Sequence, residues 1–379
     1  MKLSEKRGRK NINLLGASSL FNDIGSEMIT PILPFFITAL GGTGLAIGLL
    51  SGLREGLSSI FKLLGGWLSD RLGKRMPFVF LGYLTSVIFR ALLYLSTAWQ
   101  FVIAFVSLER IGKARDAPRD AIITDSTDLR GRGFGIHQMM DTSGAIIGSI
   151  IVLIIFWAFN ISFRNIIIIA AAISALSLLP LFFVKEPKTK AIRKSLFRGI
   201  KKMNKKLKYF IFVTSIFTLG NFGLYMFLVF RAKQITNSTI IALFLYVLFN
   251  IVWATFTVPF GTLSDKIGRK KVLMMGYVLF FFVGLGFIFQ DGIIYLGSLF
   301  LLYGLVFAIT QSNQRAYVSD LADKMKGTAL GTFYFITGIV NIIGGLIAGI
   351  LWDISVPAMF IYVTAIAFIS IVLLAFVKE

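Results

Sequence analysis

Two acidic residues, Asp23 and Glu27, lie four positions apart in the stretch "FNDIGSEMITPILP". In a helix this spacing places both carboxylates on one face, together with Ser19 and Thr30. Two carboxylates this close in a medium of low dielectric raise each other's affinity for a proton unless a cation lies between them. Such a pair can bind and release protons. The alternative is a static cluster of buried ion pairs that holds neighbouring helices together.

Further ionisable residues interrupt the apolar stretches, and most of them lie in the first half of the chain. Ionisable side chains are costly in an apolar environment and usually serve a function there. The second half has only Arg231 and Lys233 at such positions. The candidates for a proton-coupling site or a substrate cavity are Asp23, Glu27, Arg54, Arg90, Glu109, Arg110 and Asp141. Arg54 and Arg90 are the cations that could alternate as partners of Asp23 and Glu27.

Residues that bind transition metals or form redox centres are nearly absent. The chain has no Cys and a single His, His137, which excludes disulfides and zinc–thiolate sites. We expect no metal cofactor, although a carboxylate site for a hard cation remains an alternative. His137 could sense pH, but a buried histidine with satisfied hydrogen bonds is the favoured interpretation. The sequence has no nucleotide-binding glycine motif, so we expect no cofactor and an ion or substrate gradient as the energy source.

The segments that carry these residues have the composition of a membrane protein. Of the 379 residues, 56% are hydrophobic and only 15% are charged, and the mean hydropathy is +0.81. A soluble protein has about a quarter of its residues charged. Apolar runs such as "IIGSIIVLIIFWAF" are part of segments close to the roughly 20 residues that cross a bilayer.

We predict an all-α integral membrane protein with twelve transmembrane helices. The predicted spans are 12–38, 44–66, 76–96, 98–116, 133–158, 164–184, 209–233, 239–260, 272–289, 292–312, 328–352 and 356–377. Several exceed the length of a straight span, which implies tilt or an extension beyond the membrane. Pro31 and Pro34 interrupt the first span, and this is tolerated where neighbouring groups replace the lost backbone hydrogen bonds.

The distribution of Lys and Arg predicts the orientation of the chain. Basic residues crowd the N-terminal tail and alternate loops, whereas the other loops and adjoining helix ends have only Arg164, Arg231 and Lys233. Cytoplasmic loops of membrane proteins carry an excess of Lys and Arg. We therefore expect a multi-pass protein of the cell membrane with both termini in the cytoplasm. The net charge of +21 is explained by this topology, and no nucleic acid partner is expected.

One long linker separates two sets of six helices. Between residues 185 and 208 the chain has eleven Lys and Arg and a single acid, Glu186. We predict an N-terminal six-helix bundle (1–186), a basic cytoplasmic linker (187–208) and a C-terminal six-helix bundle (209–379). The sequence "KSLFRGIKKMNKKLKYF" favours either an amphipathic helix on the anionic inner leaflet or a solvated linker.

Two stretches 195 residues apart are nearly the same, namely "GGWLSDRLGKR" (65–75) and "FGTLSDKIGRKK" (260–271). The correspondence extends to Asp125 and Asp320. Two homologous six-helix halves, related by an axis along the membrane normal, are typical of transporters that bind substrate near the bilayer midplane.

These stretches resemble the signature between helices 2 and 3 of the major facilitator superfamily, G-x-L-[SA]-D-R-x-G-[RK]-[RK], once in each half. The stretches "ERIGKARDAPRDAIITDS" in helix 4 and "FNDIGSEMITPILP" in helix 1 resemble a bacterial and archaeal branch of that superfamily. The resemblance covers nearly the whole chain. It implies the fold of the superfamily and a secondary transporter that works by alternating access.

In that family the signature residues are thought to hold the cytoplasmic side shut in the outward-open state. The resemblance implies gate roles for Asp70, Arg71, Lys74, Asp265, Lys266 and Arg269. The glycines of the signature permit a tight turn, and the aspartates can accept hydrogen bonds at a helix N-terminus or pair with arginine. Arg119 aligns with Arg315 of the other half, and we expect both to belong to the inner gate.

We predict a monomeric secondary transporter, not an enzyme, that exchanges protons for amphipathic, drug-like or metabolite molecules and exports them. In helix 5, Gly144 and Gly148 form a small-residue packing face that is similar to an exporter motif. One alternative is an importer of a small organic anion, with Arg54 and Arg90 as its ligands. Others are a carboxylate-based mover of cations or lipids and, least favoured, a membrane sensor without transport activity.

Overall fold

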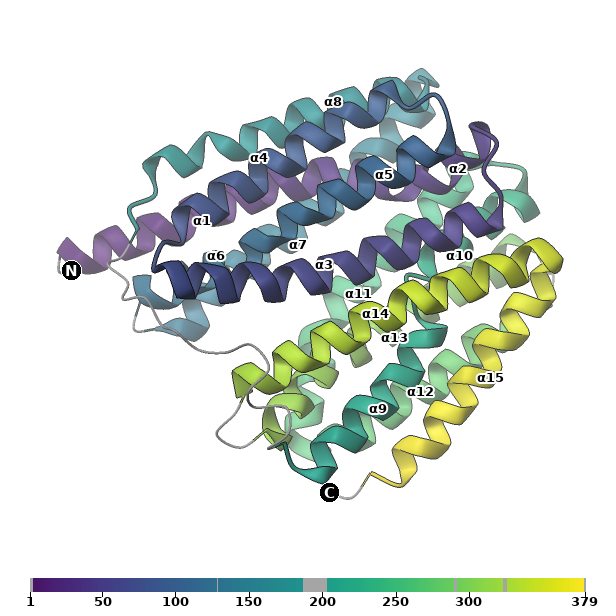
Figure 1. Cartoon of the computed structure of the whole chain (residues 1–379). Helices are drawn as coiled ribbons and strands as arrows, with labels where there is room; N and C mark the ends of the chain where they lie inside the picture. Colours follow the sequence, from purple (N-terminus) through teal and green to yellow (C-terminus); the bar gives the residue numbers. More distant parts are fainter. Residues whose placement is uncertain (1–2, 128, 187–202, 290–291, 323–325, 378–379) are drawn as a thin grey trace. The chain divides into compact units, whose positions relative to one another are not determined.

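The computed structural model describes residues 3–127, 129–186, 203–289, 292–322 and 326–377 (Figure 1). Within these ranges every regular element is a helix. In chain order they are α1 (Leu3–Ile29), η1 (Thr30–Ile32), α2 (Leu33–Ala39), α3 (Gly44–Leu72), α4 (Met76–Leu92), η2 (Leu93–Leu95), α5 (Trp99–Glu109), η3 (Arg110–Arg115), α6 (Asp116–Ser126), α7 (Arg130–Phe159), α8 (Phe163–Ala175), η4 (Leu176–Leu178), η5 (Pro180–Phe183), α9 (Lys205–Gly220), α10 (Tyr225–Thr236), α11 (Thr239–Ile267), α12 (Arg269–Gly286), α13 (Ile293–Leu321), α14 (Lys326–Ile354) and α15 (Val356–Ala375). Most of the predicted basic linker, with much of its candidate amphipathic helix, lies outside the described residues.

The described helices form the twelve predicted spans. Seven spans are single helices, and five consist of consecutive helical pieces. Among the described residues, eight helical stretches are long and apolar enough to cross a membrane by length and composition. In the first half, the first, second and fourth predicted spans fall short of this criterion. These three spans carry most of the ionisable residues. The predicted all-α fold with twelve membrane helices is confirmed.

The first span is interrupted at its prolines, as the sequence predicts. Between α1 and α2, Thr30–Ile32 form one 3₁₀ turn. Pro31 and Pro34 each lie at one of the first two positions of a helical piece, where the missing N–H costs least. The Thr30 hydroxyl donates to the carbonyl of Ser26 at 2.8 Å. This bond satisfies a backbone carbonyl next to the break.

The two signature stretches are mostly helical, which corrects the predicted helix ends at 66 and 260. Helix α3 continues to Leu72 and α11 continues to Ile267. A glycine with positive φ ends each helix, at 65° for Gly73 and 101° for Gly268, values that glycine adopts without strain. The polar residues of the signature suggested a loop, but a helix that extends past the apolar span can carry them.

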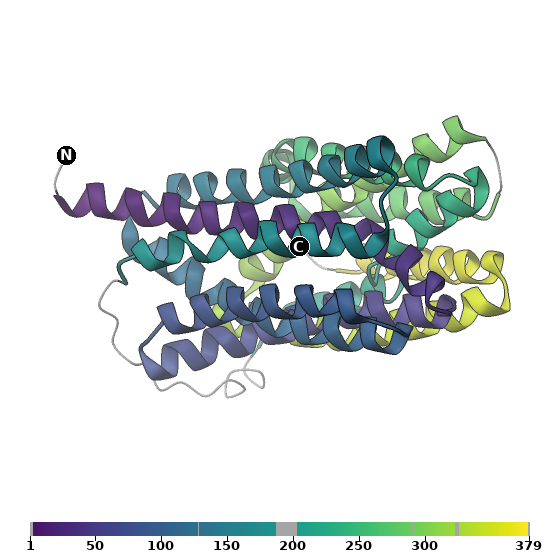
Figure 2. The same cartoon turned by 90° about the horizontal axis from the view of Figure 1, so that it is seen from above.

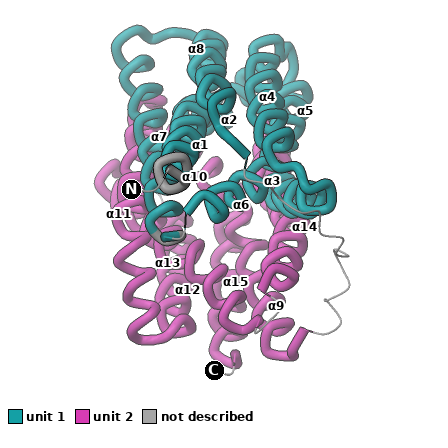
Figure 3. Tube along the Cα trace, turned by 90° about the vertical axis from the view of Figure 1, so that its left-hand side faces the viewer, with its two compact units in different colours: residues 1–40, 57–195 teal, residues 41–56, 196–379 magenta. Residues whose placement is uncertain are grey.

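The chain divides into two compact units (Figure 3). Unit 1 comprises Met1–Leu40 and Leu57–Ser195, and unit 2 comprises Gly41–Gly56 and Leu196–Glu379. The first part of α3 therefore belongs to unit 2 and its second part belongs to unit 1. The units differ from the predicted six-helix bundles in this segment, and the bundle boundaries remain a prediction.

In unit 1, α1 lies between α7 and α8 (Figure 2). Glycines of α7 let the two backbones approach closely. A Cβ at Gly144 would lie 2.6 Å from the carbonyl oxygen of Leu20, and one at Gly148 would lie 2.9 Å from Cα of Ile24. The predicted small-residue face of helix 5 is therefore confirmed as a packing face, and α1 is the helix that packs on it.

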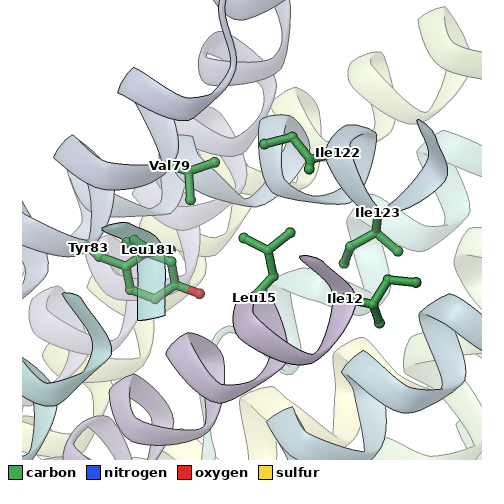
Figure 4. Packing of buried hydrophobic residues seen from close by; sticks show 7 residues of the cluster. All are labelled: Ile12, Leu15, Val79, Tyr83, Ile122, Ile123 and Leu181. Atoms are coloured by element: carbon green, nitrogen blue, oxygen red, sulfur yellow. The ribbon is translucent and has the colours of Figure 1, made fainter. Parts of the chain in front are cut away.

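A buried apolar cluster joins α1, α4, α6 and η5 of unit 1 (Figure 4). Its members are Ile12, Leu15, Val79, Tyr83, Ile122, Ile123 and Leu181. Leu15 lies one helical turn before Ser19 on α1. The cluster thus holds the Tyr83 ring against α1, where its hydroxyl contacts Ser19 at 2.9 Å.

In unit 2, the seventh span is broken between α9 and α10. The break contains Gly223, whose φ is 92°. The Tyr303 hydroxyl donates to Oδ1 of Asn221 at 2.7 Å, and the Tyr362 hydroxyl donates to the carbonyl of Leu219 at 3.0 Å. These bonds satisfy polar groups at the break, which is the condition for an irregular backbone inside a membrane.

The start of α3 packs against α14 through a glycine seam, which belongs to unit 2. The glycines of the seam are Gly44, Gly48, Gly52, Gly56, Gly338, Gly345 and Gly349. A Cβ at Gly48 would lie 2.8 Å from Cα of Gly349, and one at Gly345 would lie 2.9 Å from Cα of Gly52. No other residue type would permit this backbone-to-backbone contact.

The carboxylate of Asp353 caps the N-terminus of α3 beside the seam. It accepts from the backbone N–H of Gly44 at 2.7 Å and of Leu45 at 2.9 Å, and from the Thr43 hydroxyl at 2.6 Å. An acid at this position satisfies free N–H groups and the positive end of the helix dipole.

Candidate functional site

Asp23 of α1 faces Asp141 of α7 within unit 1, and the two carboxyl groups are close enough to share a hydrogen bond. Asn22 donates to Oδ1 of Asp23 at 2.9 Å. The positive charges of Lys113 and Arg115 act on Asp23 from η3. Both residues are half-buried. Two facing carboxylates with limited access to water repel strongly when both are charged, so such a carboxyl pair binds a proton or another cation.

One helical turn away, Ser19 and His137 form a second polar contact between the same helices. Ser19 Oγ lies 3.1 Å from His137 Nε2, and both side chains are buried. Ser19 precedes Asp23 by four residues, and His137 precedes Asp141 by four. The two contacts are therefore stacked along the α1–α7 interface, because residues four apart share a helix face.

The Ser19 hydroxyl is the centre of a buried hydrogen-bond network. It contacts the Tyr83 hydroxyl at 2.9 Å and accepts from Nη1 of Arg119 at 3.0 Å. Arg119 also pairs with Asp120 at 3.1 Å and lies 3.6 Å from Asp116. The network thus ties the predicted inner-gate residue Arg119 on α6 to helix α1.

Arg115 supports this network by packing against the Tyr83 ring. Its guanidinium carbon lies 4.2 Å from the ring centroid, a favourable cation–π arrangement. Its Nη1 donates to Ser86 Oγ at 2.8 Å and to the carbonyl of Gly112 at 2.9 Å. The side chain is buried, so we interpret Arg115 as a fixed element of the site.

A second buried charge cluster contains Arg90, Glu109 and Arg110. Arg90 Nη2 donates to Oε1 of Glu109 at 2.8 Å, and Glu109 also pairs with Arg110. Arg90 Nη1 donates to Ser174 Oγ at 2.5 Å and to the Asn22 carbonyl at 3.1 Å. The main partner of Arg90 is therefore Glu109, and not the carboxylates of helix 1 as the sequence suggested.

We expect Glu109→Gln to lower the stability of the protein. The substitution leaves the buried guanidinium groups of Arg90 and Arg110 without their shared counter-charge, which costs about 3–5 kcal/mol. Thermal unfolding of the purified protein in detergent, followed by tryptophan fluorescence, should show a fall of several degrees. Gln100→Ala, at an exposed position of the same helix, is the control. Equal unfolding temperatures for Glu109→Gln and the wild type would contradict the assigned role.

Ion pairs beside the signature lie at corresponding places in the two units, and two of the gate candidates, Asp265 and Arg269, take part in them. In unit 2, Arg269 pairs with Asp265 at 2.6 Å and with Asp320 at 3.2 Å. In unit 1, the counterpart of Asp320 is Asp125, which pairs with Arg75 at 2.5 Å. These pairs link the loop signature to the end of helix 4 or helix 10 of the same unit.

The remaining signature residues in unit 1 are more exposed. Asp70 and Lys74 are exposed and make no ion pair with any other residue described in this unit. Arg71 stacks over the ring of Trp67, with 5.4 Å from its guanidinium carbon to the ring centroid. In unit 2, Lys266 is exposed as well. The two copies of the signature thus differ in their contacts despite their similar sequences.

The predicted equivalence of Arg119 and Arg315 does not extend to their contacts. Arg119 is buried and bound to Ser19, whereas Arg315 is half-buried and donates to the carbonyl of Gln311 on its own helix at 3.0 Å. Only Arg119 therefore reaches a polar network of the helix core.

Arg54 and Glu55 lie in the part of α3 that belongs to unit 2. Arg54 is buried, and Glu55 accepts from the Tyr225 hydroxyl at 3.0 Å. Tyr225 begins α10 directly after the break in the seventh span. The first half of the sequence thus supplies unit 2 with a carboxylate beside an irregular backbone.

Comparison with known proteins identifies the family. The family model of the Major Facilitator Superfamily matches residues 15–344. The chain belongs to the Major Facilitator Superfamily. This MFS transporter is 49% identical over 378 residues to an uncharacterized MFS-type transporter of Methanocaldococcus jannaschii, covering 97% of this chain and 95% of the relative. It is 26% identical over 324 residues to the multidrug resistance protein MdtH of Proteus mirabilis, covering 81% of this chain and 78% of MdtH.

Solved structures of other transporters share the fold of this MFS transporter. The nucleoside transporter NupG matches with a TM-score of 0.78 and 16% identity, over 96% of this chain and 97% of NupG. The POT family transporter PepTSo matches with a TM-score of 0.80 and 13% identity, over 97% of each chain. At these identities the likeness concerns the fold alone.

Within this MFS transporter the predicted cavity residues separate into distinct groups. Asp23 and Asp141 form the carboxyl pair, and Arg90, Glu109 and Arg110 form the second cluster. Arg54 belongs to unit 2, and Glu27 lies next to Thr30, whose hydroxyl is 3.4 Å from its Oε1. The sequence therefore identified the residues of the carboxyl pair but did not match the two to each other.

Sequence reasoning missed Arg75 and the role of Ser19 as a shared partner. Arg75 directly follows Lys74 in the signature, and its partner Asp125 had already been matched to Asp320 by the repeat. The spacing of four between Ser19 and Asp23, repeated between His137 and Asp141, was a second available indication. Equal spacing on two helices predicts stacked contacts wherever those helices pack side by side.

Proposed function

We propose that this MFS transporter is a proton-coupled exporter of amphipathic, drug-like or metabolite molecules in the cell membrane. It acts as a monomer with both termini in the cytoplasm and exposes its substrate site alternately to the two sides. Protons that enter down their gradient drive the substrate outward.

The observation that carries the proposal is the carboxyl pair of Asp23 and Asp141. A proton-driven antiporter needs an acid, partly shielded from water, that binds a proton and the substrate in alternation. Two facing carboxyl groups meet this need, because one bound proton or one cationic substrate group relieves the repulsion between them. Lys113 and Arg115 lie near enough to stabilise the charged state once the proton has left.

The substrate class is inferred from two features. Aromatic rings are packed within unit 2, where Phe249 lies 5.4 Å from Tyr303 and 5.2 Å from Phe307 between ring centroids, and such side chains favour apolar or amphipathic ligands. The relative MdtH carries the name of a multidrug resistance protein. Arg90 is engaged by Glu109, which disfavours the alternative of an anion importer with Arg90 as a ligand.

We further propose that the ion-pair clusters around Arg75 and Arg269 act with Arg119 as the inner gate. Asp125 pairs with Arg75, which directly precedes α4, and Asp320 pairs with Arg269, the first residue of α12. The carboxylates of these pairs are exposed. Ion pairs near water contribute little to stability, so the pairs can break and reform during transport.

The test is ethidium transport by the purified full-length protein in proteoliposomes. With an imposed proton gradient, ethidium is expected to accumulate against its own gradient, and an ionophore that collapses the proton gradient should abolish this accumulation. Liposomes without protein are the control for leakage. Ethidium accumulation that is unaffected by the ionophore would exclude proton coupling. If ethidium does not move at all, while uridine is taken up with protons, the export proposal is wrong.

A further inference from the structure

His137 shares a hydrogen-bond partner, Ser19, with the predicted inner-gate residue Arg119, one helical turn from the carboxyl pair. Its ring contacts Ser19 Oγ at 3.1 Å, and the same oxygen accepts from Arg119 at 3.0 Å. Asp141 lies one turn further along α7. The imidazole therefore stands one helical turn nearer to the N-terminal ends of α1 and α7 than the carboxyl pair does.

The hydrogen bonds around Ser19 can be completed with His137 in either protonation state. With neutral His137, Ser19 accepts from Arg119 and Tyr83 and donates its hydroxyl proton to Nε2. With protonated His137, Ser19 accepts from Arg119 and from Nε2–H, and donates to the Tyr83 oxygen. A hydroxyl provides one donor and two acceptor sites, so both arrangements leave none of the four groups without a partner. The hydrogen bonds alone therefore do not decide between the two protonation states of His137, and the surrounding charges do.

The charged groups around the imidazole ring affect its protonation. The charged groups that act on His137 are Arg119 and Asp116 of α6, Asp23 of α1 and Lys62 of α3, and the titratable Tyr83 of α4 completes the set through Ser19. Protonated His137 and Arg119 would be two cations on one oxygen, with their nitrogens at most about 6 Å apart. Like charges this close repel when they are shielded from water.

We propose that His137 relays protons between the carboxyl pair and the inner side of the membrane, and that its protonation displaces Arg119 from Ser19. The proton leaves a carboxyl group of the pair, which becomes a carboxylate, and binds to a lone pair of the imidazole. The imidazolium then gives the proton to water at the inner mouth. This inference rests on the proposed function, because the relay serves a proton-coupled cycle.

The displacement of Arg119 gives the relay a second consequence. While Arg119 is bound to Ser19, protonation of His137 is disfavoured, so the relay is closed. When Arg119 leaves Ser19, protonation becomes easier. Proton release is thereby linked to the state of a residue in the inner gate, and the linkage acts equally in both directions.

The chain has a single histidine, so its imidazole can be observed without assignment. In protein labelled with ¹⁵N-histidine and purified without a histidine tag, nuclear magnetic resonance should follow one imidazole through a pH titration. In Arg119→Gln we expect the midpoint to rise by about one pH unit or more, because a nearby positive charge is removed. In Asp23→Asn the midpoint should fall. Arg132→Gln, which removes an exposed charge from the same helix, should shift the midpoint much less.

Transport provides the second readout. We expect His137→Gln, whose side-chain amide can still bond to Ser19, to reduce proton-driven ethidium accumulation by roughly tenfold or more. Gln138→Ala, at the exposed neighbouring position, should retain it. An unchanged midpoint in Arg119→Gln, or full proton-driven transport by His137→Gln, would overturn the inference. If wild-type transport is independent of the proton gradient, the proposed function fails instead, and the titrations still test the Arg119–His137 linkage.

Discussion

Asp141→Asn is expected to abolish proton-driven accumulation of ethidium, with a loss of roughly 100-fold or more. The amide cannot release a proton, so Asp23 loses the partner with which it shares one. Passive exchange of ethidium across the membrane, in the absence of any gradient, should persist, because the substitution removes the coupling step and leaves the alternation of the transporter in place. The measurement is ethidium fluorescence in proteoliposomes with and without an imposed pH gradient.

Glu27→Gln is the informative comparison for this prediction. By spacing alone Glu27 is as good a partner for Asp23 as any residue, since the two are four apart on α1. Asp141, in contrast, faces Asp23 across the helix interface. We expect Glu27→Gln to lose less than about tenfold. A reversed order, with Glu27→Gln the more damaging variant, would show that the carboxyl pair is not the coupling site.

Gly48→Leu should separate the first part of α3 from α14. A Cβ at Gly48 would lie 2.8 Å from Cα and 2.9 Å from the backbone nitrogen of Gly349, so the neighbouring backbone would have to move. Overpacking against side chains costs about 1–3 kcal/mol, and a backbone yields less readily. We expect an apparent unfolding temperature several degrees below that of the wild type, and loss of most ethidium transport.

Gly261→Leu provides the matched control, since Gly261 is also a helical glycine but has no atom within 4 Å of an added Cβ. It should keep the wild-type unfolding temperature or exceed it, because glycine is a poor helix former by about 1 kcal/mol. If both leucine variants behave alike, the glycine seam does not hold unit 2 together.

The helices and the repeat were predictable from sequence because both depend on local patterns. Long apolar runs define the spans, Pro31 and Pro34 define the interruption of the first, and the pair of signature stretches defines the duplication. Gly144 and Gly148 could be recognised as a packing face from their spacing of four. None of these inferences requires knowledge of which helix lies next to which.

The pairing of charged side chains was not predictable in the same way. Whether Asp23 meets Glu27, Arg90 or Asp141 depends on the rotation of α1 about its axis and on the helix that lies against that face. The sequence pattern defines neither the rotation of α1 nor its neighbouring helix. The choice of Arg75 over Lys74 as the partner of Asp125 is a similar case, because both residues lie in the short connection between α3 and α4, where no helical periodicity defines the direction of a side chain.

The loop signature shows how composition can mislead about local structure. Its polar residues suggested a connecting loop between two spans. In the structure, only Gly73, Lys74 and Arg75 separate α3 from α4. A charged helix end is stable outside the apolar layer. Composition therefore did not locate the end of the helix.

The division of α3 between the units has a consequence for dissecting this protein. Cutting the gene at the linker would give a C-terminal fragment that lacks Gly41–Gly56, and the glycines of α14 would then have no backbone to rest against. Such a fragment should be insoluble or protease-sensitive when produced alone and should be rescued by co-expression of the N-terminal fragment. A segment from the first part of the sequence thus completes the packing of helices that follow the linker.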